Sequence, residues 1–224
     1  MKDFFYTSLG LMSGTSMDGV DVSIIKSDGY DQFSSIFNDY YEFDNEFYKE
    51  LTNLRDKISK YEDLKKYSSE LILTEKKFTL FNAKIINEII KKSEKKIDLI
   101  GFHGQTIFHS PIEKISKQLG DGKLLSQMTK RIVVNNFRQN DIKNGGQGAP
   151  LTPIFHNLVS KIINKKFNTK YPITFINIGG ITNITQIANN DENFNSNIFA
   201  YDIAPGNCLI DQWVRSHTEK KFDK

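Results

Sequence analysis

The sequence predicts an α/β protein in which a pattern of strands followed by helices occurs twice. Apolar runs separated by turn residues indicate strands near residues 4–12 and 97–102. Between them, residues 45–96 carry apolar side chains at helical spacing. A second strand–turn–strand pattern begins near residue 173, and another strand and helix follow it. This restart predicts two α/β lobes, an arrangement that typically encloses a ligand cleft.

The first half should open with a β-hairpin and continue into helices. Residues 4–12 and 20–25 are the two expected strands, with a glycine-rich turn at 14–19, and a third strand is expected at 34–43. Two or three amphipathic helices should follow in residues 45–96, with their Lys and Glu side chains in solvent.

The middle of the chain should alternate between buried strands and short helices. Residues 97–102 and 132–134 are apolar enough for buried strands, with a helix at 123–131 between them. Residues 135–150 are rich in Gly and Asn and are expected to form a loop, and residues 151–163 return to helical spacing.

The last part, after a linker at residues 165–170, should contain a second hairpin. Its strands are expected at residues 173–178 and 181–187, joined by Gly179 and Gly180. A strand should end at residue 202, and Pro205 suits the first position of a helix that includes residues 207–216.

Composition and charge exclude several classes of protein. The 224 residues are 38% apolar and 12% aromatic, which is enough to bury a core. The net charge is only +3 and Arg occurs four times, so nucleic acid is not an expected partner. Cys208 is the single cysteine, no signal peptide is visible in residues 1–6, and no apolar run is long enough for a membrane span. We therefore expect a soluble, cytoplasmic protein.

Two glycine-containing turns are candidate phosphate loops. Residues 14–19 combine clustered backbone N–H groups with the hydroxyls of Thr15 and Ser16, and Asp18 could hold Mg²⁺. Gly179 and Gly180 occupy the matching place in the second half. A plain hairpin turn is the alternative for the first loop, and no P-loop motif is present.

Other polar residues follow the predicted strands, where α/β proteins bind ligands. His103, Gln105 and His109 come after the strand at 97–102. Arg138 and Asp141 precede the loop at residues 145–150, and they could pair with each other or contact substrate hydroxyls. The loop itself either reverses the chain tightly or shapes a ligand wall.

Asp202 is the carboxylate with the most interesting position, since it lies between a strand and a helix start. It could cap the helix or act as a general base. Cys208 lies near the start of the same helix, but no His is expected beside it, so a buried small side chain is favoured over a nucleophile.

Seven segments together resemble the anhydro-N-acetylmuramic acid kinase family, which belongs to the acetate and sugar kinase/Hsp70/actin superfamily. They are GLMSGTSMDGVD at 10–21, FHGQT at 102–106, QLGD at 118–121, NFR at 136–138, GGQGAPL at 145–151, NIGGITN at 177–183 and PGN at 205–207. Their order and spacing match across essentially the whole chain.

The resemblance implies duplicated actin-like, ribonuclease H-like lobes. The first would span residues 1–168, and residues 169–224 would begin a second lobe that is incomplete, since family members continue further. The implied activity is that of an ATP-dependent, Mg²⁺-using kinase in peptidoglycan recycling, with a homodimer expected. It would convert 1,6-anhydro-N-acetylmuramic acid into N-acetylmuramic acid 6-phosphate with hydrolytic opening of the anhydro ring. The alternative is a truncated, non-catalytic remnant or sugar-binding module, whereas the sugar-kinase motifs disfavour an actin-like or chaperone-like structural protein.

The resemblance also implies roles for individual residues. Asp202 would be the catalytic general base and Asp18 the metal ligand. Sugar contacts would come from His103, Gln105, Arg138 and Asp141. The ATP-binding residues would be Gly14, Thr15, Ser16, Met17, Asp18, Gly19, Val20, Asp21, Gly179 and Gly180. One departure is that Ile203 and Ala204 follow Asp202, where the family usually has Thr or Cys and then Gly, so the base could be crowded.

Overall fold

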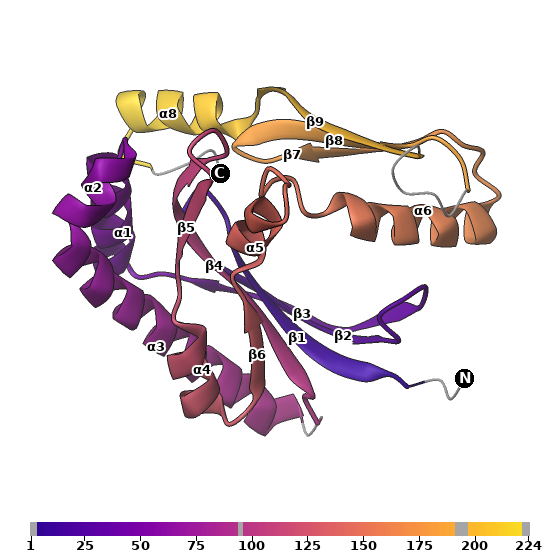
Figure 1. The fold of residues 1–224 in the computed structure, drawn as a ribbon, viewed down its shortest axis with the longest axis horizontal. Helices are drawn as coiled ribbons and strands as arrows, with labels where there is room; N and C mark the ends of the chain where they lie inside the picture. Colours follow the sequence, from indigo (N-terminus) through magenta and orange to yellow (C-terminus); the bar gives the residue numbers. More distant parts are fainter. Residues whose placement is uncertain (1–3, 94–95, 191–196, 221–224) are drawn as a thin grey trace. The chain divides into compact units, whose positions relative to one another are not determined.

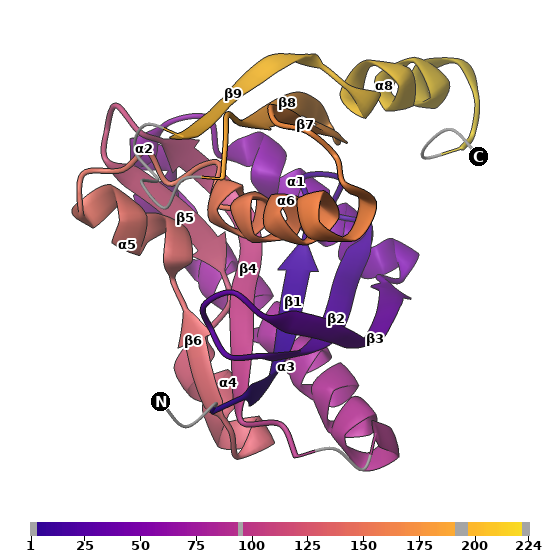
Figure 2. The same cartoon turned by 90° about the vertical axis from the view of Figure 1, so that its right-hand side faces the viewer.

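The computed structural model describes residues 4–93, 96–190 and 197–220 (Figures 1 and 2). The chain forms two compact units, residues 1–148 and residues 149–224, and each is described by itself. The expectations about a leader within residues 1–3 and about the end of the chain at 221–224 lie outside the described residues.

None of the helices in the described ranges is both long enough and apolar enough to cross a membrane.

The first unit combines one mixed sheet with helices. Its elements, in chain order, are β1 (Tyr6–Ser13), β2 (Gly19–Ser27), β3 (Phe33–Glu42), α1 (Asn45–Lys57), α2 (Tyr61–Lys66), α3 (Ser68–Ser93), β4 (Leu99–Ser110), β5 (Ile115–Leu119), α4 (Gly122–Thr129), β6 (Ile132–Asn135) and α5 (Phe137–Lys143). The hairpin, the third strand and the helices expected between residues 4 and 96 are confirmed. So is the mixed α/β class.

The sheet has six strands in the order β3-β2-β1-β4-β5, with β6 also paired to β4. Strands β1, β2 and β3 form an antiparallel meander, while β1 and β6 both run parallel to β4. The free side of β4 is shared, because residues 99–102 pair with β6 and residues 105–110 pair with β5. The pairing partner of β4 therefore changes near residues 103 and 104.

The core of this unit lies between the sheet and the helices α1 and α3 (Figure 2). The apolar side chains of β1, β2 and β4 pack against those that recur at helical spacing in α1 and α3. Phe43 lies at the centre of an aromatic cluster, with its ring centroid 5.1 Å from Phe47, 6.0 Å from Phe78 and 4.9 Å from Phe81. Phe43 and Phe78 are fully buried, and burial of each contributes roughly 1.5–3 kcal/mol, whereas Phe47 and Phe81 are partly buried.

The second unit contains a three-stranded antiparallel sheet with a helix on one face. Its elements are α6 (Pro153–Phe167), β7 (Ile173–Ile178), β8 (Ile181–Ile187), β9 (Ile198–Pro205) and α8 (Asn207–His217), with the strand order β7-β8-β9. Helix α6 packs on the sheet, since the His156 ring stacks on Phe175 at 4.7 Å and its Nδ1 lies 2.9 Å from the Thr185 hydroxyl. The predicted hairpin around Gly179 and Gly180 is confirmed.

Several expected boundaries differ from the structure. Helix α6 contacts β8 and β9, and the two compact units divide between residues 148 and 149, whereas the lobe boundary at residue 168 stays a prediction. The strand expected at 97–102 continues to Ser110, and the expected loop at 135–150 contains α5. The strand β5 lies in a segment for which no strand was expected, because its sequence ISKQL shows little apolar character.

Three burial or capping expectations are wrong. Strand β6 is at the sheet edge, and Ile132 and Val134 are 69% and 43% exposed rather than buried. Cys208 is exposed, not a buried small side chain. Pro205 is the last residue of β9 and does not begin α8, because Gly206 occupies the N-cap position.

Candidate functional site

Most of the predicted site residues of the first unit lie at one edge of its sheet. Strands β1, β4 and β6 are mutually parallel, and their register aligns Leu11 with Phe102 and Phe102 with Asn135. The turn after β1, the middle of β4 and the start of α5 therefore follow the carboxyl ends of the parallel pairing. Ligands of α/β sheets commonly bind at this edge.

The turn after β1 has a compact and well-anchored shape. Met17 adopts a left-handed conformation (φ 57°), its side chain is only 1% exposed, and its N–H donates to the Gly14 carbonyl at 3.2 Å. A Cβ on Gly19 would collide with the Tyr41 carbonyl and the Tyr40 ring, so only glycine fits there. The side chains of Met17 and Val20 are both in the core, so these two predicted ATP-binding residues offer a ligand only their backbone.

The side chain of Gln105, on β4, holds this turn in place through hydrogen bonds. This side chain is fully buried, and its Nε2 donates to the Gly14 carbonyl at 3.0 Å. The Ser13 hydroxyl lies 2.6 Å from Oε1 of Gln105 and 2.8 Å from the Gly19 carbonyl, so its one hydrogen is shared between two acceptors. These contacts occupy the carbonyls of Gly14 and Gly19. Gln105, predicted to touch sugar, thus supports the turn in this structure.

A bulge in β4 places Gln105 in this position. Leu11 of β1 pairs with Phe102, but Ser13 pairs with Gln105, so Met12 faces two residues of β4. Gly104 takes a positive φ of 79°, which glycine adopts without strain. The extra residue changes the face of the strand on which each following side chain lies.

Two carboxylates lie close together at this turn, that of Asp18 within it and that of Asp21 near the start of β2. The pKa of Asp21 is raised by burial and then by the charge of Asp18. The pKa of the Tyr40 hydroxyl is raised by burial, by the charge of Asp18 and by its hydrogen bond to that carboxylate. The Ser16 hydroxyl also donates to Asp18, at 2.5 Å. Asp18 is therefore held by two hydroxyls and lies close enough to Asp21 to repel it.

These carboxylates fit a Mg²⁺ ion that is shared with phosphate. Mg²⁺ is commonly bound by one or two carboxylates together with water and phosphate oxygens. The described residues contain no group of three or more His, Cys, Asp or Glu that could hold a metal alone. An ion at Asp18 and Asp21 would thus take its other ligands from water or phosphate, as an ATP-bound ion does.

A second cluster joins β4 to α5. Arg138 Nε donates to His103 Nε2 at 2.8 Å, and His103 Nδ1 lies 2.7 Å from the Gly104 carbonyl. Since that carbonyl can only accept, Nδ1 carries the hydrogen and Nε2 is the acceptor. Burial and the charge of Arg138 lower the pKa of His103 to about 4, so His103 is neutral at pH 7.

The glycine loop after α5 is clamped by two of the predicted residues. Arg138 Nη1 donates to the Gly148 carbonyl at 2.8 Å, and the Gly148 N–H donates to Asp141 Oδ2 at 2.8 Å. Arg138 and Asp141 are not paired with each other; they hold opposite sides of the same residue. Gly148 has a φ of 74°, and a Cβ there would press on Ile142. This arrangement is compatible with both interpretations of the loop, a tight chain reversal and a wall for a ligand, because the reversal lies beside Arg138.

The Gly179–Gly180 turn of the second unit is built differently from the first. Its carbonyls accept from the start of α8: Gly206 N–H and Cys208 N–H donate to Gly180 at 2.9 and 3.3 Å, and Asn207 N–H donates to Gly179 at 2.7 Å. These carbonyls hold the helix in place. Only the N–H groups of this turn could bind an anion.

Asp202 lies within β9, opposite Asn183 of β8, and is exposed. In the described part of the chain its carboxylate has no hydrogen bond or ion pair. The capping alternative is wrong, because the N-cap of α8 is Gly206 and no side chain caps it. A carboxylate without a protein partner is available to accept a proton from a ligand.

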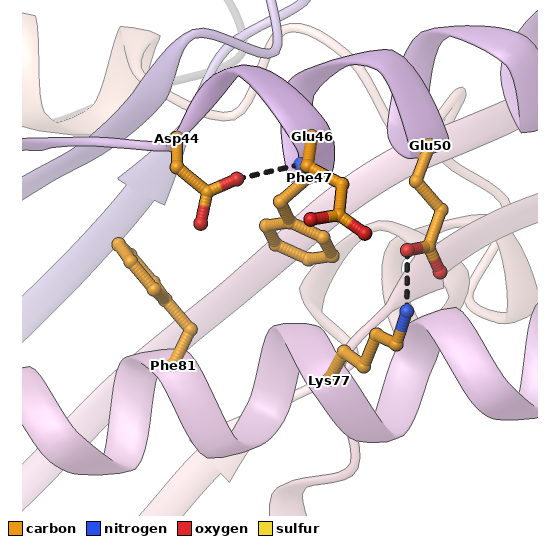
Figure 3. Close-up of a pocket in the computed structure, with 6 residues that line it drawn as sticks. All are labelled: Asp44, Glu46, Phe47, Glu50, Lys77 and Phe81. Atoms are coloured by element: carbon orange, nitrogen blue, oxygen red, sulfur yellow. Dashed lines mark hydrogen bonds and ion pairs between the residues drawn. The ribbon is translucent and has the colours of Figure 1, made fainter.

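A pocket of about 260 Å³ lies between α1 and α3, and none of the predicted site residues lines it (Figure 3). It is lined by Asp44, Glu46, Phe47, Glu50, Lys77 and Phe81. Asp44 caps α1 by accepting from Phe47 N–H at 2.8 Å, and Lys77 pairs with Glu50 at 2.6 Å. Three of its charged groups, those of Asp44, Glu50 and Lys77, are thus already used in holding the helices.

Comparison with known proteins identifies the family. A sequence model described as anhydro-N-acetylmuramic acid kinase matches residues 6–224. The anhydro-N-acetylmuramic acid kinase of Pelagibacter ubique (strain HTCC1062) is 56% identical over 220 residues, which are 98% of this chain and 57% of that protein. The chain belongs to the anhydro-N-acetylmuramic acid kinase family.

More distant members of the anhydro-N-acetylmuramic acid kinase family match over the same share of their length. The protein of Agrobacterium fabrum is 39% identical over 97% of this chain and 57% of its own length. That of Rhizobium etli is 37% identical over 99% of this chain and 58% of its own. The chain thus spans a little over half the length of the curated relatives it matches.

Three residues that support the candidate site were given no role from the sequence. Ser13 and Tyr40 support the turn and its acid, and Gly148 is the residue that Arg138 and Asp141 clamp. Tyr40 had a detectable signal, since hairpin pairing places the strand at 34–43 beside Asp21. Ser13 and Gly148 lie within the motifs at 10–21 and 145–151, but their roles depend on contacts with residues farther along the chain or on a positive φ.

Proposed function

We propose that this chain carries the phosphate- and sugar-binding portion of an ATP-dependent anhydro-N-acetylmuramic acid kinase. The reaction would transfer the γ-phosphoryl group of ATP to O6 of 1,6-anhydro-N-acetylmuramic acid while water opens the anhydro ring. The product would be N-acetylmuramic acid 6-phosphate, an intermediate in cell-wall recycling in the cytoplasm. The observation that carries the proposal is family membership over residues 6–224.

The first unit has groups suited to phosphate. The Gly14 and Gly19 carbonyls accept hydrogen bonds from Gln105 and Ser13, and Met17 N–H donates to the Gly14 carbonyl, so the other N–H groups of the turn would be the donors toward an anion. Asp18, with Asp21 beside it, would hold Mg²⁺, which would neutralise charge on the phosphates. Phosphoryl transfer requires positioning and charge neutralisation more than covalent chemistry from the protein.

The proposal gives Asp202 the role of general base. Its carboxylate would take a proton from the water that attacks the anomeric carbon. Gly179 and Gly180 would contribute N–H groups toward phosphate. His103, Arg138 and Asp141 would contact the sugar, and Gln105 would act through the turn.

The duplication of actin-like lobes is part of the same proposal. Each unit contains an antiparallel three-stranded meander with a glycine in the first turn, followed by a helix: β1-β2-β3-α1 in the first and β7-β8-β9-α8 in the second. The second lobe would be completed by sequence of the kind that the longer relatives contain. Pairing of two chains into a homodimer also belongs to this proposal.

The test measures ADP release from ATP by the purified chain with 1,6-anhydro-N-acetylmuramic acid, and detects the product by mass. In water enriched in ¹⁸O, the product should carry the label at the anomeric carbon. Asp202→Asn should abolish turnover, whereas Asp211→Asn in α8 serves as the matched control and should retain it. Sugar-dependent ADP release that survives Asp202→Asn would contradict the role of Asp202.

A second candidate function is a sugar-binding module without turnover. The observation that favours it is that the first unit by itself brings together His103, Arg138 and Asp141, the side chains proposed to contact the sugar. Calorimetry separates the two candidates: sugar binding without ADP release supports the module, whereas release supports the kinase. Absence of both sugar binding and ADP release would refute both.

A further inference from the structure

Arg138 is a half-buried cation without an acidic partner among the residues that the structure describes. Its two hydrogen bonds go to neutral acceptors, His103 Nε2 and the Gly148 carbonyl. Within the described residues, none of the ion pairs involves Arg138. Removing a charge from water is costly without a counterion, and native proteins usually pair such a group. We therefore expect the Arg138 guanidinium to pair with an anionic group of a ligand.

The orientation of the guanidinium is fixed, but most of its donors are unused. A guanidinium has five N–H donors in one plane. Nε and one N–H of Nη1 are occupied, at 2.8 Å each, which leaves three, two of them on Nη2. Since contacts on two sides hold the plane, an anion that used the remaining donors would meet a preorganised fork.

The charge around Arg138 matches an anion with a single charge. His103 is neutral, and the pKa of His109 is also lowered, by burial and by the charge of Arg138. Asp141, the acid on the same helix, is held by the Gly148 N–H. Arg138 is the one cation of this cluster, with no Lys or second Arg among its described hydrogen-bond partners, so it suits a carboxylate better than a doubly charged phosphate. Arg and carboxylate also match in geometry, through two parallel N–H···O bonds.

We propose that Arg138, oriented by His103 and Gly148, binds the carboxylate of an acidic sugar and selects that sugar over its neutral counterpart. That this carboxylate is the lactyl group of N-acetylmuramic acid rests on the proposed function. His103 is then a positioning residue, because it acts through Arg138.

The first experiment needs no turnover. The side-chain N–H signals of Arg138 are followed by ¹⁵N NMR in the 224-residue chain during titration with D-lactate, with lactamide as the neutral isostere and inorganic phosphate as the competing anion class. D-lactate should shift Arg138 Nε–H and saturate, and lactamide should not. Equal shifts with lactamide, or tighter binding of phosphate than of lactate, would overturn the proposal.

Variants test the geometry of the fork. Arg138→Gln should abolish lactate binding, and Arg138→Lys, which keeps the charge but loses the fork, should weaken it by about tenfold or more. Arg55→Gln, on α1 in an exposed pair with Asp56, is the control and should bind as the wild type does. Lactate binding that survives Arg138→Gln in a folded protein would refute the assignment. If both Arg138 variants unfold, the comparison of lactate with lactamide on the wild type still decides.

The second experiment uses activity and separates this inference from the proposed function. The kinase assay compares 1,6-anhydro-N-acetylmuramic acid with 1,6-anhydro-N-acetylglucosamine, which lacks the lactyl group. Arg138→Lys should raise KM for the first substrate only and reduce the preference between the two. Lactate binding without any kinase activity would contradict the proposed function and still support the carboxylate site. Kinase activity with an unchanged preference between the two sugars in the variant would contradict the carboxylate site and leave the proposed function unaffected.

Discussion

Replacing Gln105 with Leu should destabilise the first unit by removing the anchor of its turn. Leu has a similar volume, so the main loss is polar: the Gly14 carbonyl loses its donor at 3.0 Å, and the Ser13 hydroxyl loses its acceptor at 2.6 Å. Each group keeps one partner, because the Gly14 carbonyl also accepts from Met17 N–H at 3.2 Å and the Ser13 hydroxyl can donate to the Gly19 carbonyl at 2.8 Å. The loss is therefore that of two hydrogen bonds, each with a net contribution of about 0.5–1.5 kcal/mol, and we expect the free energy of unfolding to fall by about 1–3 kcal/mol.

The assay is urea unfolding of the 224-residue chain, followed by circular dichroism. At a typical slope of roughly 2 kcal/mol per molar urea, the midpoint should fall by about 0.5–1.5 M. Gln147→Leu, in the exposed loop after α5, is the matched control and should leave the midpoint unchanged within error. An unchanged midpoint in Gln105→Leu would refute the reasoning, because the buried hydrogen bonds would then contribute nothing measurable.

Gln105→Glu adds a pH dependence to the same test. A buried carboxyl that must donate to the Gly14 carbonyl can do so only when protonated, so its pKa in the folded protein should lie above the ordinary value of about 4.3. The stability deficit relative to wild type should therefore be small below pH 4 and grow as the pH rises through the folded pKa. A deficit that stays constant between pH 4 and pH 7 would contradict this account.

Three further predictions concern the turn and its neighbours. Gly19→Ala should destabilise the protein by about 1–3 kcal/mol, because its methyl group would collide with β3, and thermal melting measures the loss. Since the folded pKa of His103 is about 4 and an ordinary His has a pKa of about 6.5, stability should be full above pH 6.5 and fall by roughly 2–3 kcal/mol as the pH drops to 4. Asp18→Asn should lower the pKa of Asp21 in a ¹³C NMR titration, because burial and then the Asp18 charge raise it.

Each of these has its own control and its own contradicting result. Gly14→Ala should be tolerated, since the nearest atom to its Cβ is 3.7 Å away at the flexible Ser16 hydroxyl, and equal losses at both glycines would argue against the collision. His103→Gln should reduce the loss of stability at low pH. If a buried His at another position caused that loss, this variant would leave it unchanged. An Asp21 pKa that does not move in Asp18→Asn would leave burial as its entire cause.

The strands and helices with a strong period could be predicted from the sequence, and so could the turn at residues 14–19. Elements decided by long-range contacts could not. Strand β5 has the sequence ISKQL, and it forms a strand because β4 offers an unpaired edge. Helix α5 lies among Gly and Asn residues that locally favour a loop, and its ties to β4 and to Gly148 come from Arg138 and Asp141.

The candidate site was predictable in membership but not in roles. The sequence placed His103, Arg138 and Asp141 near the same strand ends, and the structure joins them through Gly148. It could not show that Gln105 faces inward, because a strand with regular alternation would place residues 103 and 105 on one face. The bulge that breaks the alternation has no signature beyond a single glycine.

That bulge has a consequence for how this segment can vary. In β4 the buried positions are Ile100 and Phe102 before it, and Gln105 and Ile107 after it, so burial changes from even to odd numbers within the strand. Deleting Gly104 would remove the extra residue and still leave Phe102, Gln105 and Ile107 on the buried face, because the remaining residues alternate regularly. A deletion in a regularly alternating part of the strand would instead turn every later side chain to the opposite face. The length of this segment can therefore change at the bulge with the turn and the core kept in place, whereas the same change before it would move Gln105 away from the turn and Ile107 into solvent.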